Sequence, residues 1–363
     1  MKRLRTGVVG CGLVAQVMHL PFLRELSDRY EVRALCDISP RALAHAGAAF
    51  PDARRHARAE DLLAEELDAV FVLTPGSHAP VAIAAAEADR HVFVEKPMCI
   101  DPDEGRRMID AAAASNVVLM VGYMKRYDPA YEQLHATLDR EALTYARITT
   151  LESPLEPYVA HLPLGHGAPD VDAELLASLA AADGLLVEEA LPGADELTQR
   201  VYRAILLDSM IHELNGVRGL LGEPTALHFA RFSPDGRSVT TSLSFGGVEC
   251  AAVWIDLPGI ARYQQDWAFY GPDERASLRF PSPFLRNEPT QLVVEGGELG
   301  TAHAWETVQT VSYDEAFKRE LVEFHAAVSE GRPARTDGTD GLRDVVLCQS
   351  IARAHAAMEV AHA

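Results

Sequence analysis

Thr6-Gly7-Val8-Val9-Gly10-Cys11-Gly12-Leu13-Val14-Ala15 joins an apolar run, Leu4 to Val9, to a segment whose apolar residues have helical spacing. This order predicts a buried strand, a glycine turn and a helix, which together bind the pyrophosphate of a dinucleotide. Gly10 permits the tight turn, and Gly12 allows the backbone to approach the pyrophosphate. Ala15 stands where a third glycine usually packs the helix against the strand. The positive end of the helix dipole would then face the phosphates.

A carboxylate follows the second apolar run. Val32 to Cys36 predicts another strand, and Asp37 comes directly after it. This carboxylate would accept hydrogen bonds from the adenosine ribose hydroxyls and repel a 2′-phosphate, so NAD is favoured over NADP. Ser39 and Arg41 are residue types that bind phosphate, so NADP remains an alternative.

Strand and helix patterns alternate through the first third of the chain. Expected strands cover 4–9, 32–36, 69–73, 92–94 and 117–121, and Ala-rich helical segments lie at 41–50, 79–88 and 103–114. This alternation predicts a doubly wound parallel sheet, the Rossmann arrangement. Ligands bind beyond the carboxyl ends of such strands. The residues to inspect at that edge are therefore Gly10 to Gly12, Asp37, Thr74 to His78, Glu95 to Pro97 and Tyr123 to Tyr127.

The pattern changes near residue 122. A helix over 129–138, an extended run over 143–153 and short β-rich runs between 225 and 311 predict an α/β domain with a large, mostly antiparallel sheet. Helices are expected at 314–330 and 342–361, and the stretch from Leu155 to Asp195 is expected to be loop with one short helix. The expected domains are 1–124, 125–334 with an insertion at about 155–200, and a C-terminal segment at 335–363.

Composition narrows the class of protein. A formal net charge of −20 argues against binding to nucleic acid or to an anionic membrane. No apolar run reaches the roughly 18 residues that a membrane span needs, and the N-terminus does not fit a signal peptide. The five cysteines have no metal-binding spacing and indicate a reducing compartment, so we expect a cytoplasmic protein without a metal site.

Lys96 is the first candidate catalytic residue. Only four of the 33 basic residues are lysines, and Lys96 stands at the end of the strand expected over 92–94, before Pro97. Lysine is a compact donor whose pKa falls readily on burial or beside another cation, such as an oxidised nicotinamide. The alternative is a surface lysine that pairs with Glu95.

Asp208 and His212 form the second candidate. They are four positions apart, so on an α-helix they would share one face. A histidine can transfer a proton at neutral pH, and a nearby carboxylate can orient it. The alternatives are a helix-surface pair or a partnership with Glu213. A zinc site is disfavoured because no third ligand has a recognisable spacing.

These motifs together resemble the Gfo/Idh/MocA oxidoreductases. The resemblance rests on Gly10-Cys11-Gly12-Leu13-Val14-Ala15, Glu95-Lys96-Pro97, Gly122-Tyr123-Met124-Lys125-Arg126-Tyr127-Asp128, and Asp208 to His212 followed by Leu220-Leu221-Gly222-Glu223-Pro224. It implies a Rossmann domain, a second α/β domain whose open sheet often forms an oligomer interface, and a C-terminal helix returning to the first domain. It also implies that Lys96, Asp208 and His212 meet near C4 of the nicotinamide.

The resemblance also implies an activity and its ligands. We expect an NAD(P)-dependent enzyme that interconverts a secondary alcohol and a ketone on a sugar, cyclitol or related polyol, as a homodimer or homotetramer. The expected cofactor contacts are Gly10, Gly12, Leu13, Val14, Asp37, Ser39, Thr74, His78, Glu95 and Lys96. Tyr127 and Lys125 are expected substrate contacts, and Tyr158, His161 and His166 in the insertion could line a pocket. Alternative functions are a redox-neutral, NAD-dependent glycosidase and a non-catalytic NAD-binding regulator.

Overall fold

The computed structural model describes residues 3–165 and 170–362, so His166 lies outside the described residues. The chain divides into two compact units. Unit 1 combines Met1–Tyr123, Pro163–Pro192 and Phe317–Val346, and unit 2 combines Met124–Leu162, Gly193–Ala316 and Leu347–Ala363. The expected domain boundaries differ from this grouping in three places. Residues 163–192, expected as an insertion in the second domain, and residues 317–334, expected at its end, group with unit 1. The last helix is divided between the two units.

Unit 1 is built on a six-stranded parallel sheet with the order β3-β2-β1-β4-β5-β6. This is the strand order of a doubly wound Rossmann sheet, so the predicted fold class of the first domain is confirmed. The short β3 was not expected, because three residues with polar side chains carry no apolar pattern. The strands are β1 (Leu4–Val9), β2 (Tyr30–Cys36), β3 (Arg54–His56), β4 (Ala69–Val72), β5 (His91–Glu95) and β6 (Leu119–Gly122).

The helices of unit 1 begin at side chains that accept backbone hydrogen bonds. Ser39 caps α2 by accepting from the Ala42 N–H, and Asp101 caps α5 in a capping box with Glu104. Aromatic rings of β4, β5 and α11 (Phe71, Phe93 and Phe324) meet edge-on or tilted in the buried core. The helices are η1 (Ala15–His19), α1 (Leu20–Glu25), α2 (Pro40–Ala49), α3 (Ala59–Leu63), α4 (Ala79–Glu87), α5 (Pro102–Ala114) and α11 (Ala316–Glu330).

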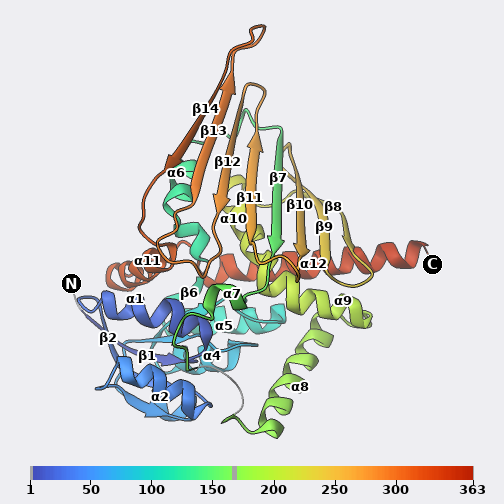
Figure 1. Ribbon diagram of the computed structural model, residues 1–363. Helices are drawn as coiled ribbons and strands as arrows, with labels where there is room; N and C mark the ends of the chain where they lie inside the picture. The colour runs from blue at the N-terminus through green and yellow to red at the C-terminus, as the bar shows by residue number, and fades with distance from the viewer. Residues whose placement is uncertain (1–2, 166–169, 363) are drawn as a thin grey trace. The chain divides into compact units, whose positions relative to one another are not determined.

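Unit 2 contains an eight-stranded sheet with the order β14-β13-β12-β11-β7-β10-β9-β8 (Figure 1). Only β7 and β10 pair in parallel, and the other neighbours are antiparallel, as predicted. The strands are β7 (Tyr145–Glu152), β8 (Ala226–Phe232), β9 (Ser238–Phe245), β10 (Val248–Asp256), β11 (Gln264–Tyr270), β12 (Glu274–Phe280), β13 (Gln291–Gly297) and β14 (Ala304–Thr310).

One face of the sheet in unit 2 is covered by helices. Gly216 lets α10 approach β11 closely, because a Cβ there would lie 2.2 Å from the Trp267 ring. Tyr131 of α6 donates a 2.9 Å hydrogen bond to the Gly216 carbonyl. The helices of this unit include η2 (Met124–Tyr127), α6 (Pro129–Thr137), α7 (Glu156–Val159), α9 (Glu196–Val201), η4 (Tyr202–Met210) and α10 (Ile211–Leu221).

The expectation of a loop with one short helix over Leu155 to Asp195 is wrong. Besides α7, the segment contains the 18-residue helix α8 (Ala173–Ala190). Asp172 caps it by accepting from the backbone N–H groups of Glu174 and Leu175, and its Ala, Leu and Glu residues favour helix. The flanking Pro and Gly residues hid this propensity.

The last helix, α12 (Gly338–His362), is shared between the units. Just before it, Thr336 pairs with β6 of unit 1, donating from its hydroxyl to the Val121 carbonyl at 2.7 Å. In unit 2, His355 accepts from the Phe232 N–H and packs against that ring. Among the described residues, no helix is both long and apolar enough to cross a bilayer.

Candidate functional site

The glycine turn after β1 begins with a position that only glycine can occupy. Gly10 has a φ of +95°, and a Cβ there would lie 2.6 Å from the Leu73 carbonyl carbon and 2.7 Å from the Thr74 nitrogen. Its N–H donates to the Cys36 carbonyl at 2.9 Å. Gly10 therefore fits the turn between the ends of β2 and β4.

Gly12 lies in open space, unlike Gly10. A Cβ at this position would find nothing within 4 Å, and the Gly12 carbonyl accepts the Gln16 N–H at 3.0 Å as the helix begins. The first N–H groups of a helix have no partner within it, and they attract anions. The open space at Gly12, beside the half-buried Leu13 and Val14, fits the backbone approach of a dinucleotide pyrophosphate.

Asp37 faces this turn from the end of β2. Its Oδ2 accepts the Cys11 N–H at 2.6 Å, and its Oδ1 accepts the Ser39 N–H at 2.7 Å. Each carboxylate oxygen keeps a further lone pair, so the half-buried group can still accept hydrogen bonds from ribose hydroxyls. The carboxylate and the glycine turn are thus joined at one edge of the sheet.

Lys96 directly follows β5 at the same carboxyl edge of the sheet. It is half-buried, its backbone N–H donates to Glu95 Oε2 at 3.1 Å, and the Lys96–Pro97 peptide bond is cis. This position is the one predicted for it in unit 1.

His78 is enclosed between two loops of this edge. Its Nδ1 lies 2.7 Å from the Pro97 carbonyl oxygen and its Nε2 lies 2.6 Å from the Thr74 carbonyl oxygen. Burial lowers the pKa of His78, so the neutral ring donates its one proton to either carbonyl. A side chain 1% exposed and engaged in this way favours positioning of the loops over direct cofactor contact.

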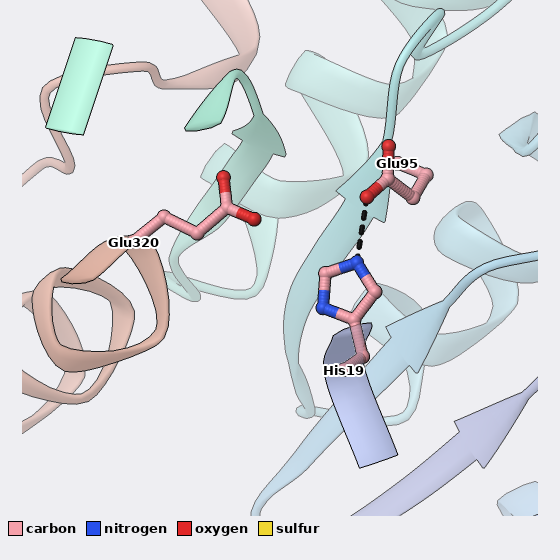
Figure 2. Close-up of side chains that lie close together, drawn as sticks. All are labelled: His19, Glu95 and Glu320. Atoms are coloured by element: carbon pink, nitrogen blue, oxygen red, sulfur yellow. Dashed lines mark hydrogen bonds and ion pairs between the residues drawn. The ribbon is translucent and has the colours of Figure 1, made fainter. Parts of the chain in front are cut away.

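Glu95, the residue before Lys96, belongs to a buried polar cluster with His19 and Glu320 (Figure 2). His19 Nε2 lies 2.6 Å from Glu95 Oε1, whereas neither oxygen of Glu320 has a hydrogen-bond partner among the described residues. Burial opposes ionisation of Glu95, but the hydrogen bond and charge of His19 outweigh it and lower its pKa. Burial, followed by the charge of Glu95, raises the pKa of Glu320 well above its usual range. One carboxyl is therefore ionised and the other protonated.

These three side chains suit proton sharing better than metal binding. Their ligand-type atoms lie within 4.8 Å of one another, but the 2.6 Å separation of His19 and Glu95 is a hydrogen-bond distance. Two ligands each about 2.0–2.2 Å from one zinc ion in a tetrahedron are separated by roughly 3 Å or more. The cluster fixes Glu95, whose other oxygen holds the Lys96 backbone.

In unit 2, the second candidate pair lies where two helix types meet. Asp208 is exposed on the π-helix η4, and His212 is half-buried in the first turn of α10. A π-helix has a slightly wider turn than an α-helix, and residues four positions apart still lie near one face of it. Such π-helical segments occur frequently at functional sites.

Glu213 has partners other than Asp208 and His212. Its Oε1 accepts the Thr150 hydroxyl at 2.6 Å and the Gln265 amide, and Gln265 in turn accepts from Lys125 Nζ. Lys125, 6% exposed, also lies over the rings of Trp267 and Phe280. Tyr127 is 1% exposed. Both expected substrate contacts, Lys125 and Tyr127, are therefore interior residues, which favours a supporting role for them.

Comparison with known proteins identifies the first domain. Residues 4–123 match the family model of the Gfo/Idh/MocA oxidoreductases, described as an oxidoreductase family with an NAD-binding Rossmann fold. The chain is 24% identical over 356 residues to myo-inositol 2-dehydrogenase of Thermotoga maritima, covering 95% of this chain and 94% of that protein. Residues 4–123 therefore carry the NAD-binding Rossmann domain of the Gfo/Idh/MocA oxidoreductases.

Solved structures share the fold over the whole length. UDP-N-acetylglucosamine 3-dehydrogenase GnnA of Acidithiobacillus ferrooxidans has a TM-score of 0.74 at 22% identity, covering 98% of this chain and 99% of that chain. Levoglucosan dehydrogenase in complex with NADH and L-sorbose has a TM-score of 0.74 at 18% identity, with 98% of each chain covered. These likenesses show that the chain shares the fold of these two solved structures over nearly its whole length.

The structure also places acidic residues that sequence reasoning missed. Glu320 lies between Phe317 and Leu321 within the apolar stripe of α11, and this position was a signal of burial but not of its partners. Glu152 ends β7 and accepts from the Ser209 hydroxyl at 3.3 Å, next to Asp208 in the chain. Burial raises the pKa of Glu152. Nothing in the local sequence distinguishes it from a surface carboxylate at a strand end.

Among the insertion residues, Tyr158 has a clear position. Its hydroxyl accepts the Tyr263 N–H at 2.7 Å and lies 3.5 Å from the Ser153 hydroxyl, both within unit 2. His161 is exposed. Tyr158 therefore ties the segment after β7 to the segment before β11.

Proposed function

We propose that this protein is an NAD(P)-dependent oxidoreductase that interconverts a secondary alcohol and a ketone on a sugar, cyclitol or related polyol. The observation that carries the proposal is the position of Lys96. It follows β5 at the carboxyl edge of the sheet where the glycine turn and Asp37 also lie. Ligands of doubly wound sheets bind at that edge. The related proteins, a myo-inositol 2-dehydrogenase and two sugar dehydrogenases, support the substrate class.

The cofactor site is assigned to residues of unit 1. Gly10, Gly12, Leu13 and Val14 receive the pyrophosphate, and Asp37 accepts the ribose hydroxyls. Thr74 and Ser39 line the two sides of this edge. Glu95 and His78 hold the loop that carries Lys96, through the Lys96 N–H and the Pro97 carbonyl. When bound, the nicotinamide accepts or supplies the hydride.

The chemistry of the substrate oxygen is assigned to three side chains. Lys96 donates a hydrogen bond to the reacting oxygen and stabilises its developing negative charge. His212 accepts the hydroxyl proton during oxidation and returns it during reduction. Asp208 orients His212 or a neighbouring substrate hydroxyl. A substrate with many hydroxyls matches these donors and acceptors.

The activity is tested with NAD⁺ and NADP⁺ against a panel of cyclitols, hexoses and glycosides, following absorbance of the reduced cofactor and products by mass spectrometry. We expect steady cofactor reduction with at least one polyol. Product without net reduction would identify the redox-neutral glycosidase instead. Dinucleotide binding without any turnover would favour the regulator.

The role of Lys96 has a matched control in the same unit. Lys96→Met should lower kcat by about 10² to 10³, the usual effect of removing one donor to a developing oxyanion. Lys318→Met removes a lysine that lies 3.2 Å from Glu25 on α1, and it should leave turnover unchanged. A Lys96→Met protein with full turnover contradicts the mechanism.

We also propose a homodimer or homotetramer in the cytoplasm. One face of the sheet of unit 2 leaves Tyr145 and Val308 40% and 51% exposed, and burial of these apolar side chains against a second copy supports an interface between copies. All five cysteines are buried free thiols, which suits a reducing compartment. Light scattering after size-exclusion chromatography measures the mass of the assembly, and cell fractionation measures the location. A monomer, or a protein in the oxidising fraction, contradicts these assignments.

A further inference from the structure

An acidic residue of the insertion occupies the donors that follow Asp37. Both carboxylate oxygens of Asp170 lie 2.9 Å from the Ser39 hydroxyl, which can donate its proton to one of them. Asp170 Oδ2 also accepts the Arg41 backbone N–H at 2.7 Å. Ser39 and Asp170 are 131 positions apart in the chain, but both belong to unit 1.

These donors are the ones that a phosphate would use. Ser39 lies two residues beyond Asp37 and caps α2, and the Arg41 N–H belongs to the first turn of that helix. A hydroxyl and a backbone N–H at a helix N-terminus form an anion-binding arrangement. In dinucleotide-binding folds the ribose hydroxyls bind at the carboxylate after β2, and a 2′-phosphate binds beside it. The Asp170 carboxylate therefore occupies the donors to which a 2′-phosphate would bind.

Asp170 is ionised at neutral pH. The Arg41 N–H lowers the pKa of this carboxyl, and the Ser39 hydroxyl adds to the effect. The nearby Asp37 carboxylate already disfavours a phosphate, so Asp170 adds a second negative charge at the same end of the site.

The insertion is attached to unit 1 on both sides of Asp170. Gly165 donates its N–H to Gln16 Oε1 at 2.9 Å, and Gln16 also donates to the Cys11 carbonyl at 2.6 Å in the glycine turn. On α8, Asp183 Oδ1 accepts the Ser77 N–H at 3.4 Å, in the loop after β4. Asp170 is therefore held between contacts to loops that follow β1 and β4.

We propose that Asp170 makes the cofactor site selective for NAD over NADP by occupying Ser39 and Arg41 and repelling a 2′-phosphate. NAD carries a hydroxyl at this position, which is neutral and leaves these contacts intact. This inference rests on the dinucleotide binding of the proposed function. It assigns cofactor choice to a segment outside the strand–turn–helix that forms the rest of the site.

The test compares two nucleotides that differ only in the 2′-phosphate, 5′-AMP and 2′,5′-ADP. Their dissociation constants are measured by calorimetry for the wild-type protein, Asp170→Asn and Asp170→Ala, and then repeated with NAD⁺ and NADP⁺. The control is Asp172→Asn, which keeps an oxygen for the cap of α8 and changes a charge two residues away. All measurements are made at one low ionic strength, because screening weakens charge repulsion.

We expect both Asp170 variants to bind 2′,5′-ADP and NADP⁺ at least about tenfold more tightly, with affinity for 5′-AMP and NAD⁺ changed by less than about threefold. Asp172→Asn should behave as wild type. An unchanged ratio of the affinities for 2′,5′-ADP and 5′-AMP overturns the inference. An equal gain in both affinities is one such result, and it would mean that Asp170 obstructs both nucleotides alike. If neither the wild-type protein nor any variant binds a nucleotide or a dinucleotide, the proposed function itself fails. Binding of both nucleotides with an unchanged ratio of affinities overturns only the inference about Asp170.

Discussion

Gly10 and Gly12 lie two positions apart in one turn but are required for different reasons. At Gly10 the positive φ and the nearby Leu73 and Thr74 backbone exclude any side chain in the folded protein. At Gly12 the backbone is ordinary and the space is open, so a side chain would oppose only a ligand. The same residue type thus serves folding at one position and binding at the other.

Gly10→Ala and Gly12→Ala separate these two roles. Gly10→Ala should lower the free energy of unfolding by at least about 2 kcal/mol, because it combines backbone strain with a steric clash. Gly12→Ala should change stability by less than about 1 kcal/mol but weaken NAD⁺ binding about tenfold or more. Thermal unfolding and calorimetric titration measure the two effects. Equal losses of stability in both variants would contradict the assignment.

Glu320 should give the protein an unusual pH dependence. Its pKa in the folded protein is raised above the ordinary 4.5 by burial and by Glu95, so the folded state holds a proton that the unfolded state releases above pH 4.5. This stabilisation is complete below pH 4.5 and is lost as pH rises towards the folded pKa. Glu320→Gln stays neutral and should gain stability relative to wild type above pH 4.5, on the order of 1 kcal/mol per pH unit.

Glu323 on the same helix is the matched control, with the opposite sign. Partial burial opposes its ionisation, but the Arg332 hydrogen bonds at 2.8 and 3.0 Å outweigh it and lower the pKa of Glu323. Its stabilisation is present above pH 4.5 and is lost as pH falls through the lowered pKa. Glu323→Gln should therefore be less stable than wild type at pH 7. Chemical denaturation across pH measures both variants, and parallel curves for Glu320→Gln and wild type would refute the protonated Glu320.

At the scale of elements, capping side chains fix where helices begin. Asp128 is an informative example, because it caps α6 and also links it to the strand region of unit 2. It accepts the Ala130 and Tyr131 N–H groups at 2.8 and 3.2 Å and the Thr290 hydroxyl at 2.6 Å. The residue is nearly fully buried, so each lost contact leaves a polar group without water.

Asp128→Ala should lower the free energy of unfolding by about 2 to 3 kcal/mol, from the lost cap and the unpaired Thr290 hydroxyl. Asp128→Asn keeps an oxygen acceptor and should lose less than half as much. Chemical denaturation measures the difference between the variants. Equal losses in Asp128→Ala and Asp128→Asn would mean that charge, and not the cap geometry, is decisive.

At the scale of the whole molecule, the chain forms two compact units with separate sheets. The residues assigned to the pyrophosphate and ribose all belong to unit 1. A ligand stabilises the folded state that binds it. Dinucleotide binding should therefore stabilise unit 1 against unfolding more than it stabilises unit 2.

Scanning calorimetry tests this expectation. We expect two overlapping transitions, and NAD⁺ at about 100 times its dissociation constant should stabilise unit 1 by about 2.7 kcal/mol. The transition of unit 2 should move less. The same scan on Gly12→Ala should show a smaller shift at that concentration of NAD⁺. A single transition that shifts as a whole would indicate that the chain unfolds as one cooperative unit.

The local sequence determined much of the fold and the first half of the site. Continuous apolar runs predicted five of the six strands of unit 1, because a strand buried on both faces is apolar along its whole length. The glycine turn, Asp37 and the position of Lys96 at a strand end were also predicted, since each depends on residues a few positions apart. The failures, β3 and α8, are elements whose apolar pattern is too short or is masked by flanking Pro and Gly.

Only the tertiary structure decided which distant charges meet. Nothing near Glu320 in the sequence indicates that it faces His19 and Glu95 in a dry interior (Figure 2). Likewise, Asp170 contacts Ser39, which is 131 positions away in the chain. The residues on either side of Asp170 in the sequence indicate only a polar segment. Pairing and protonation depend on burial and on the charges within a few ångströms, and chain folding alone brings these groups together. The sequence thus determined the cofactor-binding fold, whereas the folded chain determined the ionisation of its carboxylates and the surroundings of its ribose site.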